Sequence, residues 1–235
     1  MFTIRLAELN ITINNKYEYV KKICTDYIVE EQTDFFIEVT DTEIEAERES
    51  PKNDKGYLES LAIYRKIAEK IVDYEGFLLH GAVISIDDFG VAFLAKSGTG
   101  KTTHMNLWLK LLGNRLTVIN GDKPLVRVID KKLYAYGTPW AGKEGLNTNT
   151  KTELKNICLI SRSLVNECFC IADKGIILEK LFSQIYLPKS SQGLKQTLNL
   201  LGVVMDKCRF YSVKCNTDIT AAKTAYETIM SPVNN

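Results

Sequence analysis

The stretch LAKSGTGKTTHMNLW, residues 94–108, constrains the fold of this chain more than any other part of its sequence. The apolar run VAFLA that enters it is typical of a buried strand, and the residues that leave it have the spacing of an amphipathic helix. Between them stands Ser-Gly-Thr-Gly-Lys-Thr-Thr. A plain turn would explain the glycines but not a Lys-Thr pair at the start of a helix. The stretch therefore predicts a nucleotide-binding loop in an α/β fold.

The residue types of this loop suit a bound triphosphate. Gly98 and Gly100 allow the backbone to bend without a side chain in the way, so that several N–H groups point at one anion. The N-terminus of the following helix adds further unpaired donors and the positive end of its dipole. Lys101 is expected to reach the outer phosphates, and Thr102 to ligate Mg²⁺. The pattern G-x-x-x-x-G-K-[ST] is met from Gly100 onwards, while Ala95 stands where its first glycine is usual.

We therefore expect ATP and Mg²⁺ as the ligands of the loop. The predicted phosphate-binding residues in it are Ser97, Gly98, Thr99, Gly100, Lys101, Thr102 and Thr103.

Length and charge limit the other possibilities. The 235 residues suit one large domain, or one domain with a small appendage. The formal net charge of +1 gives no indication of nucleic-acid or anionic-membrane binding. No apolar run approaches the roughly 20 residues of a membrane-spanning helix. The six cysteines form no C-x-x-C pair, so we interpret them as reduced thiols of a cytoplasmic protein.

The chain divides most naturally near residues 47–56, ERESPKNDKG, which combine charge with Pro51 and Gly56. Residues 1–50 show the periodicities of strand, helix, strand and short helix, and predict a small N-terminal α/β region. Residues 57–235 then form the nucleotide-binding domain, which begins with a helix over residues 57–74.

Apolar strands and amphipathic helices follow one another in the second part of the chain. FLLHGAVISI and VAFLA, joined by Asp-Asp-Phe-Gly, predict a hairpin whose second strand leads into the loop. Residues 138–150, TPWAGKEGLNTNT, form a loop too long to be only a connector. We further expect strands over 115–120, 125–130, 133–137, 154–161 and 208–215, and helices over 102–112, 178–188, 194–207 and 218–230.

Two side chains outside the loop are candidates for the chemistry. The strand over 115–120 is followed by Gly121-Asp122. If this strand lies beside the strand that precedes the loop, the Asp122 carboxylate faces the same crevice as Lys101 and can hold Mg²⁺, act as a base, or do both. His80 stands in the apolar run before the loop and is either a core histidine or a site residue. His104, in the first turns of the next helix, is expected to pack or to meet solvent.

Together these motifs resemble the superfamily of HPr kinase/phosphorylase and ATP-type phosphoenolpyruvate carboxykinase, and within it the short HPr-kinase-related kinases. The resemblance rests on LHG before the loop, SGTGKTT, Asp122 twenty-one residues after Lys101, and GTPWAGKEGLNTN. It covers residues 57–230. It implies a P-loop-containing mixed sheet of the kind found in the C-terminal part of those enzymes.

The same resemblance assigns roles to further residues. It implies catalytic roles for Asp122, His80 and Lys101, with Thr102 and Asp122 at the metal. Arg162 corresponds to a basic position that contacts phosphate. Trp140, Lys143, Glu144 and Asn147 would shape the acceptor pocket. The related kinases have two adjacent acids where this chain has Gly121-Asp122, so either one carboxylate serves for both or Glu144 supplies the second.

Three functions follow as alternatives. The first is a kinase that transfers the γ-phosphoryl group of ATP to a hydroxyl of a small metabolite or a peptide. The second is a module that binds nucleotide without turnover, and the third is a carboxykinase-like enzyme. No nucleic-acid or membrane partner is expected. HPr kinases form oligomers, so the resemblance also suggests a homo-oligomer.

Overall fold

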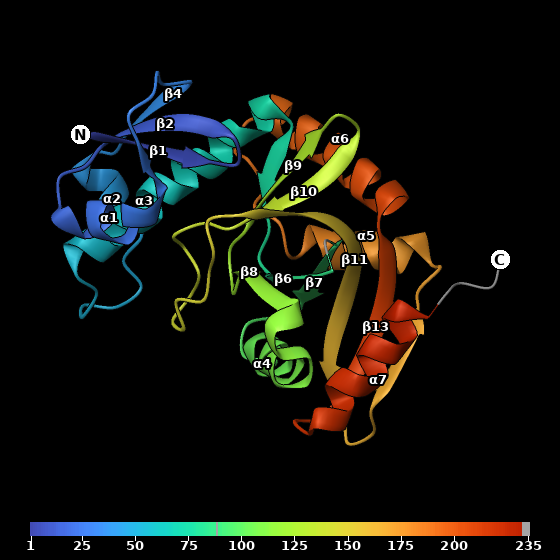
Figure 1. Cartoon of the computed structure of the whole chain (residues 1–235). Helices are drawn as coiled ribbons and strands as arrows, with labels where there is room; N and C mark the ends of the chain where they lie inside the picture. Colours follow the sequence, from blue (N-terminus) through green and yellow to red (C-terminus); the bar gives the residue numbers. More distant parts are fainter. Residues whose placement is uncertain (88, 232–235) are drawn as a thin grey trace.

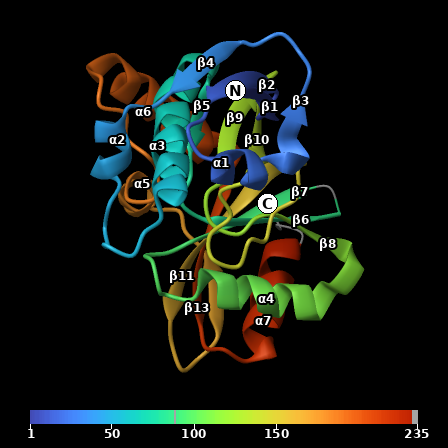
Figure 2. The ribbon, with the colours of Figure 1, turned by 90° about the vertical axis from the view of Figure 1, so that its left-hand side faces the viewer.

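The computed structural model describes residues 1–87 and 89–231 as an α/β structure with two sheets (Figure 1). The first sheet has the strand order β3-β1-β2-β4. The second is a larger mixed sheet with the path β5-β9-β10-β11-β7-β6-β8, to which β13 and β12 are added beside β11. Figure 2 shows the N-terminal elements at one end of the molecule and α4 and α7 at the other.

The N-terminal sheet follows from strict alternation of buried and exposed residues. Its strands are β1 (Phe2–Leu6), β2 (Leu9–Asn14), β3 (Ile28–Val29) and β4 (Phe35–Glu38), with the helices α1 (Glu18–Ile23) and α2 (Asp41–Ala46). Ala7 and Glu8 adopt positive φ angles in the two-residue turn between β1 and β2. The strand, helix, strand and short helix expected for residues 1–50 follow in that order, but the first expected strand is the hairpin of β1 and β2, and β3 is an addition.

The helix expected over residues 57–74 is present as α3 (Lys55–Lys70), extended by a 3₁₀ turn, Ile71–Tyr74. The Asp54 side chain caps it by accepting a hydrogen bond from the Gly56 amide. Its buried face packs into one hydrophobic core with the N-terminal sheet and with Leu125, Tyr136 and Trp140 of the larger sheet and its loops. Residues 1–50 thus share their core with α3, and the division of the chain near residue 50 stays a prediction.

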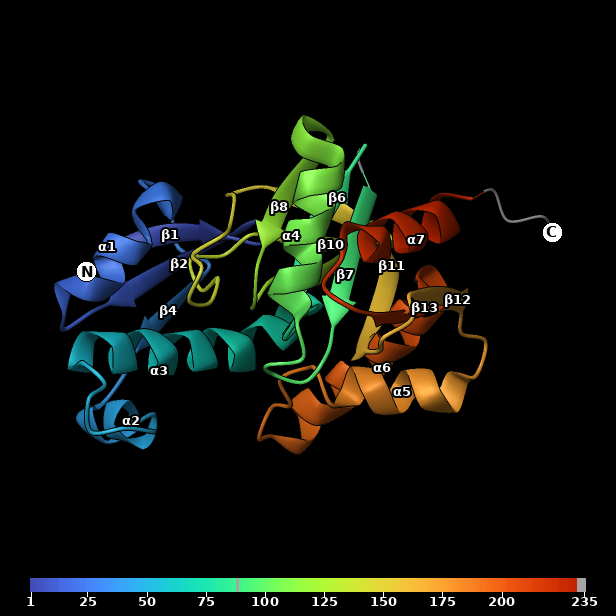
Figure 3. The ribbon, with the colours of Figure 1, turned by 90° about the horizontal axis from the view of Figure 1, so that it is seen from below.

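Helices cover both faces of the larger sheet (Figure 3). On one face, α4 (Lys101–Leu112) and α7 (Ile219–Met230) pack against residues such as Val91 and Phe93 of β7 (Phe89–Leu94). On the other, α5 (Lys174–Phe182) and α6 (Ser191–Lys207) pack against Ala92 and Leu94 of the same strand. Burial on both faces explains why this strand is a continuous apolar run in the sequence.

The remaining strands confirm most of the expected ones. The β9–β10 hairpin and the long strand β11 are present, β11 runs parallel to β7 and β13, and the Asp218 side chain caps α7. The bounds are β5 (Gly76–Leu78), β6 (Ala82–Ile86), β8 (Leu116–Asn120), β9 (Leu125–Ile129), β10 (Lys132–Tyr136), β11 (Lys151–Arg162), β12 (Glu167–Cys170) and β13 (Arg209–Cys215). The short strand β12 was not predicted.

The single strand expected over residues 77–86 is wrong, because the chain breaks at Leu79–Gly81. Its first part, β5, pairs with β9 at the edge of the sheet, and its second part, β6, pairs with β7. Both parts are buried, so their hydrophobicity gives no sign of the break. A Cβ atom on Gly81 would lie 3.1 Å from the Phe93 carbonyl oxygen, which reflects the tight passage of the backbone here. Asp88, in the expected turn, lies outside the described residues.

Two further expectations need correction. The strand β8 does not lie beside β7, because β6 stands between them and pairs with both. Being antiparallel to β6, β8 still runs parallel to β7 and ends at the same edge of the sheet. The helix expected over 178–188 ends at Phe182. The chain then runs beside the 78–80 segment, where the His80 amide donates to the Gln184 carbonyl at 2.7 Å.

A pair of glycine substitutions tests how closely the 138–150 loop packs. A Cβ on Gly137 would lie 1.8 Å from the Thr148 carbonyl oxygen, whereas one on Gly202, in α6, meets no atom within 4 Å. We expect Gly137→Ala to lower the free energy of unfolding by about 2–4 kcal/mol, since backbone must move. The control Gly202→Ala should raise it by about 0.5–1 kcal/mol. If urea denaturation gave the same change in the free energy of unfolding for Gly137→Ala and Gly202→Ala, this packing would be contradicted.

Candidate functional site

The loop between β7 and α4 is bent by glycines at positive φ. Gly98 has φ 75° and Gly100 has φ 123°, and a Cβ on either would meet no atom within 4 Å. The glycines are therefore required by backbone angle and not by crowding. The Thr99 amide donates to the Lys96 carbonyl and closes a turn inside the loop.

The first turn of α4 opens into the same space. Gly100 is its N-cap residue and supplies no side chain to cap the helix. The first amides of a helix have no partner within it, so those of Lys101, Thr102 and Thr103 are donors at the positive end of the dipole. The position of this helix is fixed by buried Met105 and Trp108 in the core beneath it.

His104 belongs to that core and not to the site. It is buried, its ring lies edge-on to Phe93, and its Nε2 accepts a hydrogen bond from the Trp108 indole at 2.9 Å. Burial lowers the pKa of His104 to about 4, so the ring is neutral near pH 7. The expectation that His104 packs is confirmed.

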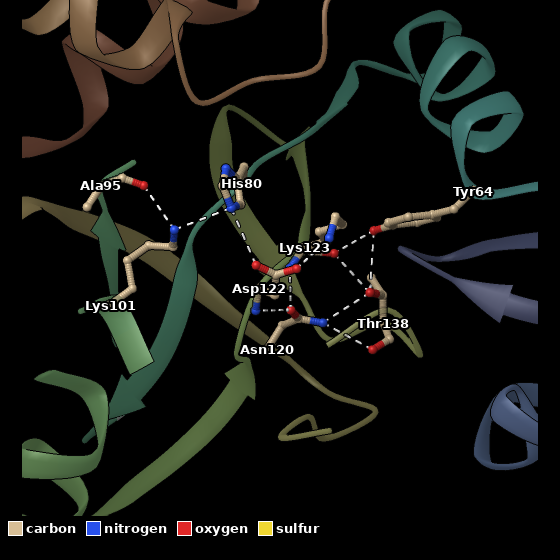
Figure 4. Close-up of polar contacts among 8 residues, drawn as sticks. All are labelled: Tyr64, His80, Ala95, Lys101, Asn120, Asp122, Lys123 and Thr138. Atoms are coloured by element: carbon tan, nitrogen blue, oxygen red, sulfur yellow. Dashed lines mark hydrogen bonds and ion pairs between the residues drawn. The ribbon is translucent and has the colours of Figure 1, made fainter. Parts of the chain in front are cut away.

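Lys101 is buried and points back toward its own loop (Figure 4). Its ammonium donates to the Ala95 carbonyl at 2.9 Å and lies 3.3 Å from His80 Nε2. Burial lowers the pKa of Lys101, and the charge of Asp122 partly offsets that effect. The side chain is thus a desolvated cation whose present partners are a carbonyl oxygen and a histidine ring nitrogen.

His80 connects this lysine to Asp122. The same Nε2 atom lies 3.4 Å from the Asp122 Oδ1 atom. It can donate a proton to the carboxylate or accept one from the ammonium, but not both at once. The position of that proton therefore couples the two charged groups. The structure brings together the three residues for which the sequence predicted catalytic roles.

Asp122 is held ionised. Burial alone would raise its pKa, but hydrogen bonds from His80 and Lys123, with the charge of Lys123, outweigh it and lower the pKa to about 2. Lys123 forms an ion pair with its other carboxylate oxygen. A carboxylate with so low a pKa is a weak base near pH 7 and suits a cation better than a proton.

Asn120 shapes the turn that carries Asp122, and sequence reasoning missed it. Its buried side-chain oxygen accepts from the amides of Asp122 and Lys123 at 2.8 and 2.7 Å, and its amide donates to Thr138. The Tyr64 hydroxyl donates to the Lys123 carbonyl at 2.6 Å from α3. Asparagine before Gly-Asp at a strand end is typical of such a side-chain turn, and that signal was available in the sequence.

Gly121 stands where the resemblance implies a second acid, and its surroundings explain the glycine. Its amide donates to the Leu146 carbonyl, and a Cβ here would lie 3.3 Å from the carbonyl oxygens of Ala141 and Leu146. On its other side the 138–150 loop also presses on Asp122, because a Cβ on Gly142 would lie 2.9 Å from the Asp122 Cβ. The loop takes the space that a second carboxylate would need.

A cleft of about 760 Å³ lies in front of the loop and Asp122. Trp140, Lys143 and Glu144, which the resemblance implies at an acceptor pocket, are among its lining residues. Trp140 is buried in the wall, stacked on Tyr64 at 4.1 Å, with its indole N–H donating to the Ser60 carbonyl. The lining residues are Tyr19, Ile23, Tyr57, Ser60, Leu61, Ser97, Gly98, Gly100, Lys101, Thr102, Thr103, Gly121, Asp122, Lys123, Pro139, Trp140, Ala141, Gly142, Lys143 and Glu144.

The N-terminal elements supply a wall of this cleft that the sequence did not predict. Tyr19 of α1 and Tyr57 of α3 are both exposed and lie edge to face, with their ring centroids 6.3 Å apart. Aromatic residues at helical spacing usually indicate core, so nothing in the sequence pointed to these two.

Two predicted site residues, Asn147 and Arg162, are not among the lining residues of this cleft. The Asn147 amide donates to the Tyr27 hydroxyl at 2.7 Å and joins the 138–150 loop to the N-terminal region. The Arg162 guanidinium donates to the carbonyls of Gly98 and Thr99 and so holds the loop from behind. Arg162 also lines a second cavity, of about 940 Å³, with Leu159 and Ile176 on the far side of the same loop.

The described residues contain no group of three or more His, Cys, Asp or Glu side chains that could hold a metal ion. Thr102 and Asp122 both line the cleft, and their oxygens are the ligand type that Mg²⁺ prefers. Within the same part of the chain, no helix is long and apolar enough to cross a membrane.

Comparison with solved structures gives partial likenesses. The chain resembles the solved structure of the Hpr(Ser) kinase/phosphatase from Coxiella burnetii, with 14% sequence identity and a TM-score of 0.31. The match covers 55% of this chain and 88% of the other. No family model and no curated protein matches the chain. At this TM-score the likeness settles neither fold type nor function, and the proposal below depends on the geometry of the site.

The low pKa of Asp122 predicts a specific loss of stability in acid. Its folded pKa is depressed, so the ionised group stabilises the fold above pH 4, and this contribution is lost as the pH falls from about 4 to about 2. At pH 7 we expect Asp122→Asn to be less stable than the wild type by about 2 kcal/mol. In urea denaturation, the difference in free energy of unfolding between the two proteins should shrink as the pH falls from about 4 to about 2. Asp206→Asn, at an exposed position, serves as the control. If the stability difference between Asp122→Asn and the wild type did not change with pH, the account would be contradicted.

Proposed function

We propose that the protein is a Mg²⁺-dependent kinase that transfers the γ-phosphoryl group of ATP to a hydroxyl of a small metabolite or a peptide. One observation carries the proposal. A glycine-bent loop and an uncapped helix N-terminus, both rich in amide donors, face an ionised carboxylate across a cleft large enough for a small ligand.

The phosphates are proposed to bind the amides of residues 97–103. Lys101 would leave the Ala95 carbonyl and His80, because a phosphate oxygen is a stronger partner for a desolvated ammonium. Its burial makes this exchange favourable, since the charge is poorly compensated at present. The arrangement therefore supports Lys101 as the residue that neutralises the outer phosphates.

Mg²⁺ would be held by the Thr102 hydroxyl and the Asp122 carboxylate, together with phosphate oxygens and water. The low pKa of Asp122 favours this role over that of a strong base. Phosphoryl transfer has a largely dissociative transition state and needs positioning and charge neutralisation more than proton abstraction. The acceptor oxygen would form its bond to the γ-phosphorus as the bond to the leaving ADP oxygen breaks, and its proton would pass to His80 Nε2 once Lys101 has moved to the phosphates.

Two cavities lie on either side of the loop, and we assign the nucleoside to one and the phosphoryl acceptor to the other. The second cavity, behind the loop, is the proposed seat of the nucleoside, since Leu94, Leu159 and Ile176 offer apolar surface to a base. The front cleft, between Trp140, Lys143 and Glu144 and the N-terminal helices, is the proposed seat of the acceptor. Ser97 and Gly98 line both cavities, which lets one triphosphate span them.

A nucleotide sensor without turnover is a second candidate. It is favoured by Gly121, because Asp122 is the one acid at this strand end, where related kinases have two adjacent acids, and the neighbouring loop fills the space of the other. A carboxykinase-like enzyme has less support. The described residues that line the front cleft include no arginine to bind a carboxylate substrate.

Removing the Lys101 charge tests nucleotide binding. We expect Lys101→Met to weaken Mg-ATP binding in calorimetry by about ten- to a hundredfold, which corresponds to the loss of a charge-assisted contact. Its melting temperature should stay equal or rise, because a desolvated ammonium is removed. Lys110→Met makes the same charge change in the last turn of the same helix and should leave binding unchanged. Equal affinity of the two variants would overturn the proposed site.

Transfer of label separates the kinase from the sensor. The protein is incubated with Mg²⁺, γ-labelled ATP and a cell extract fractionated by size. The kinase predicts label in a small-molecule or peptide fraction and at least a hundredfold loss in Asp122→Asn, with Asp206→Asn as control. A sensor would bind Mg-ATP in calorimetry but label no fraction.

A further inference from the structure

The chain carries a strong charge asymmetry that its net charge of +1 conceals. Residues 1–50 contain twelve Asp and Glu against five Lys and Arg, a net charge of −7. The remaining residues therefore carry a net charge of +8. A charge asymmetry of this size favours association with a partner, because oppositely charged surfaces attract each other over distances of about a Debye length.

The positive charge is concentrated in a groove far from the nucleotide site. The groove, of about 570 Å³, lies where β11 changes its partner from β10 to β13. Five exposed cations surround it, with Glu153 as its one carboxylate and an apolar floor that includes Leu154 and Met230. The cations are Lys131, Lys132, Lys155, Lys207 and Arg209.

Most of this positive charge is not neutralised inside the groove. Glu153 makes only long contacts to Lys132 and Lys155, at 3.9 and 3.6 Å. Among the described residues, Lys131, Lys207 and Arg209 make no ion pair. Exposed pairs of this kind contribute little to stability, so the groove remains available to an anionic partner.

Part of the acidic charge of residues 1–50 is paired with Lys or Arg, but part of it is exposed and unpaired. Asp26, Glu30 and Glu49 are exposed and form no ion pair within the described part of the chain. Figures 1 and 3 place the N-terminal sheet and the C-terminal end of α7, which borders the groove, at opposite ends of the molecule. The acidic region therefore cannot reach the groove of its own copy.

We propose that the basic groove binds the acidic N-terminal region of a second copy of this chain. Each copy then offers one acidic and one basic surface, so the contact is head-to-tail and produces a ring or an open chain of copies. The groove lies on the sheet edge away from the nucleotide loop, so this association does not depend on the proposed kinase activity.

A charge-swap experiment tests the contact. In sedimentation velocity, the wild type should associate at about 0.01 M salt, where the Debye length is about 30 Å, and dissociate at about 1 M salt, where it is about 3 Å. Lys207→Glu with Arg209→Glu should weaken association at least about tenfold, because like charges then face each other. Asp26→Lys with Glu30→Lys and Glu49→Lys should do the same.

The decisive sample is an equimolar mixture of these two variants. Each has one reversed surface, so mixing them restores opposite charges at every contact and should restore association. Lys174→Glu with Lys195→Glu is the matched control for net charge, since both lysines are exposed on α5 and α6. The proposal is overturned if the wild type sediments as a monomer at low salt, if the control weakens association equally, or if the mixture stays dissociated.

Discussion

The charges of buried Lys101 and half-buried Asp122, joined through one nitrogen of His80, are the constraint on which the organisation of this site depends. Burial of either charge alone would be unfavourable, and each is compensated by specific partners. The carboxylate has Lys123 and His80, while the ammonium has only a carbonyl and a ring nitrogen. The positive charge of Lys101 is therefore less well compensated than the negative charge of Asp122, and it lies beside the amide-rich loop.

The fold supports these charges from three directions. The parallel strands β7 and β8 bring the loop and Asp122 to one edge of the sheet, although β6 separates them. The 138–150 loop closes over Asp122 at Gly121 and Gly142. From the N-terminal side, Tyr64 of α3 binds the Lys123 carbonyl and stacks on Trp140. Residues 1–70 are thus part of the site's support as well as one wall of its cleft.

The sequence predicted the parts of the site that depend on local backbone chemistry. Glycines before a Lys-Thr pair at a helix start, and an aspartate at a strand end, have a local physical meaning that a pattern can carry. His80 could be a core or a site residue from its spacing alone, and the resemblance favoured the site, where the structure has it beside Lys101 and Asp122. Asn147 and Arg162 were expected at ligands; their side chains hold loops in the structure, and their roles at a ligand stay predictions.

The features that could not be predicted depend on contacts between residues far apart in the sequence. Tyr19 and Tyr57 line the cleft only because the N-terminal helices pack near the loop, and no spacing in the sequence encodes that packing. The break at Leu79–Gly81 is hidden, since both flanking strands are buried and equally apolar. The absence of a second acid was visible as Gly121, but its cause, the close approach of Ala141 and Leu146, appears only in three dimensions.

A crystal structure with Mg²⁺ and a non-hydrolysable ATP analogue tests the central claim most directly. The account predicts phosphate oxygens on the amides of residues 97–103, Lys101 turned from the Ala95 carbonyl to the phosphates, and a metal ion between Thr102 and Asp122. An analogue bound elsewhere, or a Lys101 ammonium still on the Ala95 carbonyl beside a bound triphosphate, would contradict it.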